Sequence, residues 1–159
     1  MRLVFGSDHA GFELKQALMP VARQLGHQVT DVGAYDSNPS DYPDFAEAVG
    51  QVLGEGGADR GVLVCGSGVG VSVAANKMPG IRAGLCHDTY SAHQGVEHDN
   101  MNVLVLGSRI IGVELAKDLL RTYLGAEFTK EERHLRRVAK VAALERRYLD
   151  AREKSDAGK

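Results

Sequence analysis

Residues 62–70 read VLVCGSGVG, an apolar run that ends in a cysteine and a glycine-rich turn. The run is continuously apolar rather than alternating, which is typical of a strand covered on both faces of a parallel sheet. Alternate glycines permit positive φ angles, and residues 71–76 behind them are expected to form the first turns of a helix. This strand-turn-helix unit predicts an α/β fold.

Similar short runs recur on both sides of this stretch, and each ends in glycine, a small polar residue or cysteine. They are residues 3–7, 29–33, 82–86 and 103–108. Between them lie segments with helical spacing of apolar side chains, such as Leu14, Leu18 and Val21. The sequence therefore predicts one doubly wound α/β domain over residues 1–150, with a five-stranded, mostly parallel sheet and helices on both faces.

A long C-terminal helix is expected from about Thr129 to Arg152, where no Gly or Pro occurs. Residues 129–132 read TKEE and match the capping box, so the helix is expected to begin there. It carries an apolar stripe that needs a cover, and either the same chain or a second subunit could provide it. The stripe consists of Leu135, Val138, Val141, Leu144 and Leu149. Residues 151–159 are expected to be a frayed tail.

Composition and charge restrict the possible partners. The chain has 159 residues, of which 43% are hydrophobic and 25% charged, and this argues against disorder. A formal net charge of −2 predicts neither nucleic acid nor membrane as a partner. Residues 127–159 carry ten Lys and Arg against seven Asp and Glu, whereas residues 1–126 carry nine against fourteen, which suits a local anion site. Without a signal-peptide pattern or ~18 consecutive apolar residues, a cytoplasmic protein with reduced cysteines is expected.

Reactive side chains follow the predicted strands, and ligands of an open parallel sheet bind beyond the carboxyl ends of its strands. Asp8 and His9 follow the first strand, Cys65 ends the third and Arg109 follows the fifth. The N–H groups of residues 66–70 could cradle a phosphate or an enolate oxygen. Neither the dinucleotide fingerprint nor the ATP-type P-loop is matched. Cys65 precedes the expected helix, which favours a thiolate that acts as nucleophile or base, although a buried filler remains the alternative.

Histidines and arginines elsewhere extend this picture. His98 lies just before the last strand and is expected to face the same crevice as His9. No HExxH or CxxC spacing supports a zinc site. Arg133 and Arg137 are four residues apart on one helix face, where they could clasp a phosphate, and Arg109 is expected to join them. A solvated charged face is the alternative, but the arrangement suits a small sugar phosphate.

Five motifs in order resemble the type B ribose-5-phosphate isomerase family, whose relatives act on galactose 6-phosphate or allose 6-phosphate. The motifs are residues 6–15, 41–43, 65–70 with 74–77, 102–104 with 107–109, and 133–137. The resemblance implies a Rossmann-like homodimer that interconverts ribose 5-phosphate and ribulose 5-phosphate in the pentose phosphate pathway. It implies neither a metal nor a nucleotide cofactor.

The resemblance also implies residue roles. Cys65 would be the base that moves a proton between carbon 2 and carbon 1, and His98 would open the furanose ring. The implied substrate contacts are Asp8, His9, Gly66, Ser67, Gly68, Val69, Gly70, Asp99, Arg109, Arg133 and Arg137. His98 and its neighbour would reach across from the partner subunit. Asp99 departs from the family, because many members have Asn there, and an ionised carboxylate cannot donate the amide's hydrogen bond.

Two other functions remain open from the sequence. One is an isomerase of a hexose 6-phosphate, because pocket depth discriminates by only ~1–3 kcal/mol per methylene and is not visible in a sequence. The other is a noncatalytic metabolite-binding module on the same fold, because a fold does not determine a function.

Overall fold

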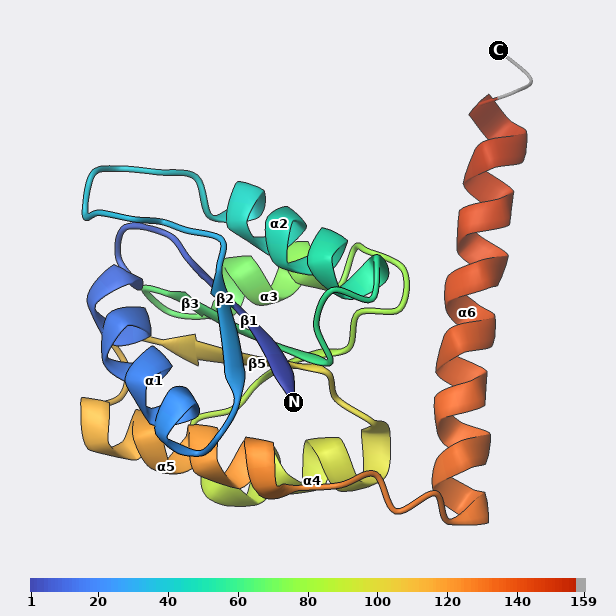
Figure 1. Ribbon diagram of the computed structural model, residues 1–159. Helices are drawn as coiled ribbons and strands as arrows, with labels where there is room; N and C mark the ends of the chain where they lie inside the picture. The colour runs from blue at the N-terminus through green and yellow to red at the C-terminus, as the bar shows by residue number, and fades with distance from the viewer. Residues whose placement is uncertain (157–159) are drawn as a thin grey trace.

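The structure is a computed structural model that describes the backbone of residues 1–156 and the side chains of residues 1–149 (Figure 1). Its strands are β1 (Arg2–Ser7), β2 (Gln28–Asp31), β3 (Arg60–Cys65), β4 (Ala83–Leu85) and β5 (Val103–Gly107). Its helices are α1 (Phe12–Gln24), α2 (Tyr42–Gly54), α3 (Val69–Ala75), α4 (Thr89–Asp99), α5 (Val113–Gly125) and α6 (Glu132–Asp156). The described elements thus alternate from β1 to α5, as predicted.

The five strands form one sheet in the order β2-β1-β3-β5-β4, and all its pairings are parallel. The predicted doubly wound α/β fold is therefore confirmed. The chain runs outward from β1 to β2 and then crosses back to β3, so β1 and β3 are neighbours whose connections leave in opposite directions. Such a switch point is where open parallel sheets bind ligands.

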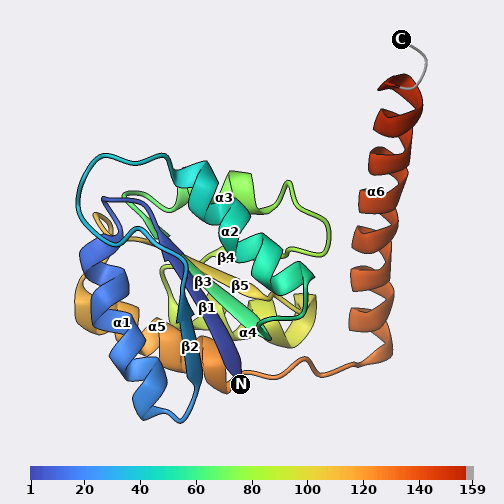
Figure 2. The same cartoon turned by 45° about the horizontal axis from the view of Figure 1, so that its top comes forward.

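Helices cover both faces of the sheet, with α1, α4 and α5 on one side and α2 and α3 on the other (Figures 1 and 2). The first core contains Phe5, Leu104 and the fully buried Tyr123, and the second contains Leu63 and Val105. Successive strand residues face opposite cores, which explains why these strands are apolar at every position rather than at every second one.

Helix α6 stands apart from the three-layered body in both views (Figures 1 and 2). One hydrogen bond joins the middle of α6 to the segment between α3 and β4: Glu145 Oε1 accepts from the N–H of Gly80 at 3.0 Å. Leu135, Val141 and Leu144 are each about half exposed. The same chain therefore leaves much of the predicted stripe uncovered.

The start of α6 differs from the prediction, because the capping box at Thr129 does not form. The Thr129 hydroxyl donates instead to the carbonyl of Glu97 on α4, at 3.1 Å, and contacts His134 Nδ1 at 2.7 Å. Lys130 has a φ of 55° and turns the chain, so that the carbonyl of Glu131 accepts from the N–H of Leu135. The Thr129 hydroxyl thus makes a tertiary hydrogen bond to α4 and does not cap the N-terminus of α6.

The end of α6 also differs from the expected tail over 151–159. The helix continues through Asp156, because no Gly or Pro interrupts it before that residue. Residues 157–159 of the expected tail lie outside the described residues.

A buried ion pair holds the segment that follows β2. Lys15 of α1 is fully buried, and its Nζ donates to Asp31 Oδ1 and, at 2.7 Å, to the carbonyl of Ala34. The ring of Tyr35 lies 5.5 Å from the same ammonium group. The segment that leads from β2 to α2 is thus tied to α1 at its beginning.

Replacing this ammonium group is expected to destabilise the fold. Lys15→Met leaves the partly buried carboxylate of Asp31 without its charged partner, and with the N–H of Gly33 as its donor. We therefore expect the free energy of unfolding to fall by about 2–4 kcal/mol. Urea unfolding measures the change. Lys117→Met, which removes the partner of the largely exposed Glu114, is the control and should cost less than about 1 kcal/mol. Equal losses for both variants would contradict a special role for the buried pair.

Candidate active site

One acidic residue, Asp8, and one basic residue, His9, follow β1 at the switch point. Asp8 is buried, and its Oδ1 accepts a hydrogen bond of 2.9 Å from the N–H of Gly11, which holds the carboxylate in one orientation. The N–H of Asp8 donates to the carbonyl of Val64 on β3, at 3.3 Å. This bond joins the residues that follow β1 to the end of β3, where Cys65 lies.

Cys65 lies directly against the glycine loop. Its Sγ accepts a hydrogen bond of 3.2 Å from the N–H of Gly68, and an anionic sulfur accepts such a bond more strongly than a neutral one. Gly68 has a φ of 81°, and helix α3 begins at the next residue. Cys65 is a free cysteine with 5% of its surface exposed. The predicted placement of this sulfur at a helix start is confirmed.

The loop packs so closely on β5 that a side chain would not fit between them. A Cβ added to Gly107 would lie 2.6 Å from the carbonyl oxygen of Ser67. The N–H groups of Gly70 and Val71 belong to the first turn of α3, which has no intrahelical acceptor for them, and they have no partner within the described residues. Gly70 is partly exposed, so its N–H is available to an anion, whereas Val71 is fully buried.

His9 is held by a residue that the sequence analysis did not identify. The N–H of His9 donates to Ser40 Oγ at 3.0 Å, and the N–H of Ser40 donates to His9 Nδ1 at 3.1 Å. The carbonyl of Ser40 lies farther from the same nitrogen, at 3.3 Å. In the shorter contact Nδ1 accepts from the N–H, and the neutral ring then carries its proton on Nε2. His9 therefore offers a donor for a ligand. Ser40 lies in a loop 31 residues away, and no local pattern links the two.

Arg109 lies beside the glycine loop. Its N–H donates to the carbonyl of Gly66 at 2.9 Å, and a Cβ added to Gly66 would lie 3.5 Å from Arg109 Cδ. Tyr42 covers the other end of the loop, because a Cβ on Gly70 would lie 3.0 Å from its Cζ. We call Asp8, His9, Cys65, residues 66–70 and Arg109 the Cys65 half-site.

A second group of predicted residues gathers where α4 ends and α6 begins. His98 Nδ1 lies 2.9 Å from Gln94 Nε2, and the ring of His98 stacks on that of His134 with centroids 4.1 Å apart. Arg133 and Arg137 project from the first turns of α6 and are exposed. Arg133 Nε donates to Glu131 Oε2 at 2.9 Å. We call His98, Asp99, Arg133 and Arg137 the His98 half-site.

The two half-sites lie near opposite ends of the parallel strands. We call the side of the sheet where the strands end its carboxyl edge, and the side where they begin its amino edge. Cys65 pairs with Gly107 at the carboxyl end of β5, whereas Gly61 pairs with Val103 at its amino end. Helix α4 starts beyond the carboxyl end of β4 and runs back over eleven residues, so His98 lies about 15 Å closer to the amino edge.

Two predictions are therefore wrong for a single chain. His98 does not face the crevice of His9, because α4 carries it to the other edge of the sheet. Arg109 does not join Arg133 and Arg137, because β5 delivers it to the carboxyl edge while α6 begins near the amino edge. In one chain, the predicted site residues thus lie in two separate groups.

Metal-binding clusters and membrane-spanning helices are both absent from the described residues. In that part of the chain, no three His, Cys, Asp or Glu side chains are grouped so that they could hold a metal ion. None of its helices combines the length and the apolar composition that a bilayer crossing requires.

The comparison with known proteins identifies the family. The model of the family described as Ribose/Galactose Isomerase matches residues 3–141. The chain belongs to the ribose/galactose isomerase family. It is 42% identical to ribose-5-phosphate isomerase B of Escherichia coli (strain K12), over 92% of this chain and 97% of that protein. It is also 42% identical to D-erythrulose-4-phosphate isomerase of Pectobacterium atrosepticum, over 80% of this chain and 85% of that protein.

A solved structure of the ribose/galactose isomerase family agrees closely with the fold. The structure of Clostridium thermocellum ribose-5-phosphate isomerase B superposes with a TM-score of 0.91 at 42% identity, and covers 93% of this chain and 99% of that chain. The predicted family, the α/β fold and the isomerase class of the enzyme are thereby confirmed. The roles of the individual site residues remain predictions.

Proposed function

We propose that this isomerase interconverts ribose 5-phosphate and ribulose 5-phosphate through an enediolate, in the cytoplasm. The observation that carries the proposal is the Cys65 sulfur hydrogen-bonded to the glycine loop beside the β1/β3 switch point. That arrangement puts a base next to unpaired backbone donors. Two free cysteines support a reducing compartment.

The Cys65 thiolate would act on the open-chain aldose. It removes the proton from carbon 2, the electron pair of that C–H bond forms the double bond to carbon 1, and negative charge develops on the carbonyl oxygen. The N–H groups of the loop stabilise this oxygen, and one such donor is worth about 2.7–4 kcal/mol. The sulfur then returns the proton to carbon 1, while the proton of the hydroxyl on carbon 2 passes to the oxygen on carbon 1. This leaves a ketone at carbon 2 and a hydroxyl at carbon 1.

Ring opening precedes this step and is the role proposed for His98. The imidazole removes the proton from the hydroxyl on carbon 1 of the furanose and delivers a proton to the ring oxygen, which breaks the bond between that oxygen and carbon 1. Asp8 and the Nε2–H of His9 would contact the sugar near its ring. Because His98 lies at the other edge of the sheet, it would act on a substrate bound at the Cys65 half-site of another chain.

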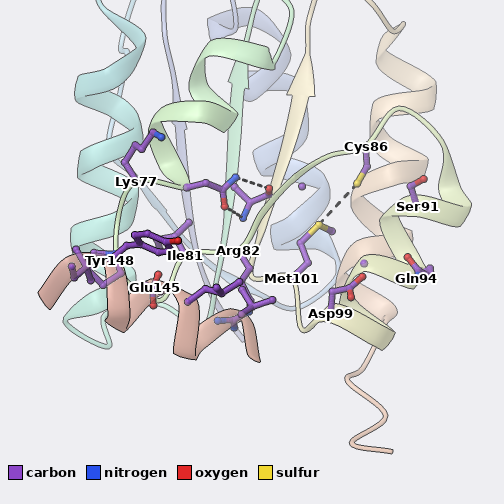
Figure 3. A pocket seen from close by; sticks show the side chains of 18 residues that line it. Lys77, Ile81, Arg82, Cys86, Ser91, Gln94, Asp99, Met101, Glu145 and Tyr148 are labelled. Atoms are coloured by element: carbon purple, nitrogen blue, oxygen red, sulfur yellow. Dashed lines mark hydrogen bonds between the residues drawn. The ribbon is translucent and has the colours of Figure 1, made fainter. Parts of the chain in front are cut away.

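A second copy of the chain would supply that half-site. An apolar-lined groove of about 840 Å³ lies between α6 and the edge of the sheet at β4 (Figure 3). Val141, Leu144 and Tyr148 line it from α6, and each is about half or more exposed. Exposed apolar surface of this kind is typical of an interface between subunits, and supports a homodimer in which each α6 packs on the partner.

Arginines of both half-sites would then bind the phosphate. Arg109 would come from one chain, and Arg133 and Arg137 from the other. Guanidinium groups bind a phosphate dianion through paired, charge-assisted hydrogen bonds.

Loss of one guanidinium is expected to weaken phosphate binding selectively. For Arg137→Ala we expect KM for ribose 5-phosphate to rise by about 10- to 100-fold, the range for a lost charged hydrogen bond. KM for unphosphorylated ribose should stay nearly unchanged. Arg136→Ala is the control, because this neighbour is exposed on a different part of the helix surface. An equal rise for both sugars would contradict the phosphate role of Arg137.

Incubation with ribose 5-phosphate in heavy water tests the function as a whole. We expect ribulose 5-phosphate to form, with deuterium at carbon 1 in those turnovers in which the proton on Cys65 exchanges with solvent before it is returned. A panel of tetrose, pentose and hexose phosphates then ranks the substrates by kcat/KM. A clear preference for galactose 6-phosphate or allose 6-phosphate would replace the pentose by a hexose. If neither a ketose nor deuterium exchange is detected, and a nucleotide stabilises the protein against heat, the protein would be a noncatalytic binding module.

A further inference from the structure

His134 is the most deeply buried histidine of the described chain, yet it lies against the exposed end of α4. Only 1% of its surface is exposed, and its ring stacks on that of His98 with an interplanar angle of 28°. We propose that His134 is a positioning residue, a neutral ring on which His98 is held flat while His98 opens the sugar ring. The inference rests on the proposed function, because it takes ring opening as the task of His98.

The hydrogen bonds of Thr129 determine which nitrogen of His134 carries the proton. The Thr129 hydroxyl donates its one hydrogen to the carbonyl of Glu97, which can only accept. The carbonyl of Glu97 also accepts from the N–H of Thr129 at 3.2 Å. The Thr129 hydroxyl oxygen lies 2.7 Å from His134 Nδ1, and with its own hydrogen directed at Glu97 it accepts a hydrogen from that nitrogen. Neutral His134 therefore carries its proton on Nδ1 and leaves Nε2 bare.

A second proton on His134 would have no partner. Nε2 is buried and makes no hydrogen bond within the described residues, so protonation there would place a charge in a site that lacks an acceptor. The surroundings act in the same direction. Burial first, and then His98, Arg133 and Arg137, lower the pKa of His134, and only Glu131 raises it. Both the missing acceptor at Nε2 and these surroundings favour the neutral form of His134.

A neutral ring is the support that a proton-transferring His98 needs. If His134 were charged, it would repel the imidazolium of His98 at a centroid distance of 4.1 Å. Its uncharged face stacks favourably on the other ring.

The remaining contacts of His98 come from α4 and involve its two ring nitrogens. Gln94 lies 2.9 Å from Nδ1, and the carboxylate of Glu97 lies 3.8 Å from Nε2 and 3.4 Å from His93 Nε2. The His98 side chain is 29% exposed, so it can still reach a substrate. His134 is too deeply buried to do so and acts only through His98.

The protonation states can be measured on the unmodified protein. Long-range ¹H–¹⁵N spectra recorded as the pH is lowered should show His134 as the neutral Nδ1–H form throughout the range in which His98 gains its proton. The Nε2–H form, or a charged His134 in that range, would overturn the proposal. This measurement depends on neither substrate nor turnover.

Two variants test the positioning role in a Cys65→Ala background, where isomerisation is expected to be lost but ring opening retained. Exchange between the α and β anomers of ribose 5-phosphate, followed by NMR saturation transfer, reports ring opening alone. His134→Leu should slow enzyme-catalysed exchange at least tenfold, whereas His134→Phe, which keeps a flat ring, should stay within about threefold. Thermal unfolding midpoints show that both variants are folded.

The results distinguish a failure of the positioning role of His134 from a failure of the proposed isomerase function. Equal exchange rates for the Leu and Phe variants, or no acceleration by the Cys65→Ala protein itself, would overturn the positioning role. If the unaltered enzyme forms no ribulose 5-phosphate while anomer exchange depends on His134 as described, the proposed function fails and the positioning role stands.

Discussion

Cys65→Ala is expected to lower kcat for ribose 5-phosphate by about 10²–10⁴-fold, the usual contribution of a positioned base. The methyl group of alanine cannot take a proton, whereas the glycine loop and Asp8 remain in place. We therefore expect binding of the phosphosugar to stay within about tenfold of the unaltered enzyme. Steady-state kinetics and a binding titration measure the two quantities separately.

Cys86→Ala is the matched control, because Cys86 is also a buried, free cysteine at the carboxyl side of the sheet. Its Sγ lies 4.0 Å from Met101 Sδ, and burial, followed by the charge of Asp88, raises the pKa of its thiol to about 11. It is therefore a protonated filler near neutral pH, and its loss should leave kcat within about twofold. Near-normal turnover in Cys65→Ala would remove Cys65 from the role of base.

Mixing two inactive variants is expected to restore activity. A chain with Cys65→Ala retains an intact His98 half-site, and a chain with His98→Asn retains an intact Cys65 half-site. If each complete site takes one half from either chain, a mixed dimer contains one intact site, and random pairing in an equal mixture should return about a quarter of the unaltered activity. Co-refolding followed by an isomerisation assay measures the recovery.

The control for this experiment pairs two changes within one half-site. Cys65→Ala mixed with Arg109→Ala should give no activity above that of the Arg109→Ala protein alone, because no mixed dimer then contains an intact Cys65 half-site. Failure of the Cys65→Ala and His98→Asn mixture to recover activity would mean that one chain forms the whole site.

Local sequence patterns were sufficient to predict the helices and strands and the residues of the Cys65 half-site. Apolar runs such as 62–65 predicted strands covered on both faces, and the glycines behind them predicted the turn that now holds Cys65. Asp8, His9 and Arg109 were predicted near Cys65 because parallel strands bring their carboxyl ends to one edge. Each of these inferences depends on periodicity and on chain direction, which short stretches of sequence carry.

Contacts between distant segments escaped the same reasoning. The hydrogen bonds between His9 and Ser40, and between Thr129 and Glu97, join residues that lie about thirty positions apart. The cap expected at Thr129 followed a correct local rule, but a tertiary contact used the hydroxyl. His134 was part of a quoted motif, yet nothing in the motif indicated that its ring would lie under His98.

The sequence alone determined an alternating α/β chain, its glycine loop and a charged helix after the last strand. Only the tertiary structure decided that β5 lies between β3 and β4, that α4 carries His98 to the amino edge, and that α6 leaves its apolar stripe uncovered. The reason is that side-chain periodicity is a property of a few consecutive residues. Strand order and helix placement depend instead on which surfaces pack together across the whole chain.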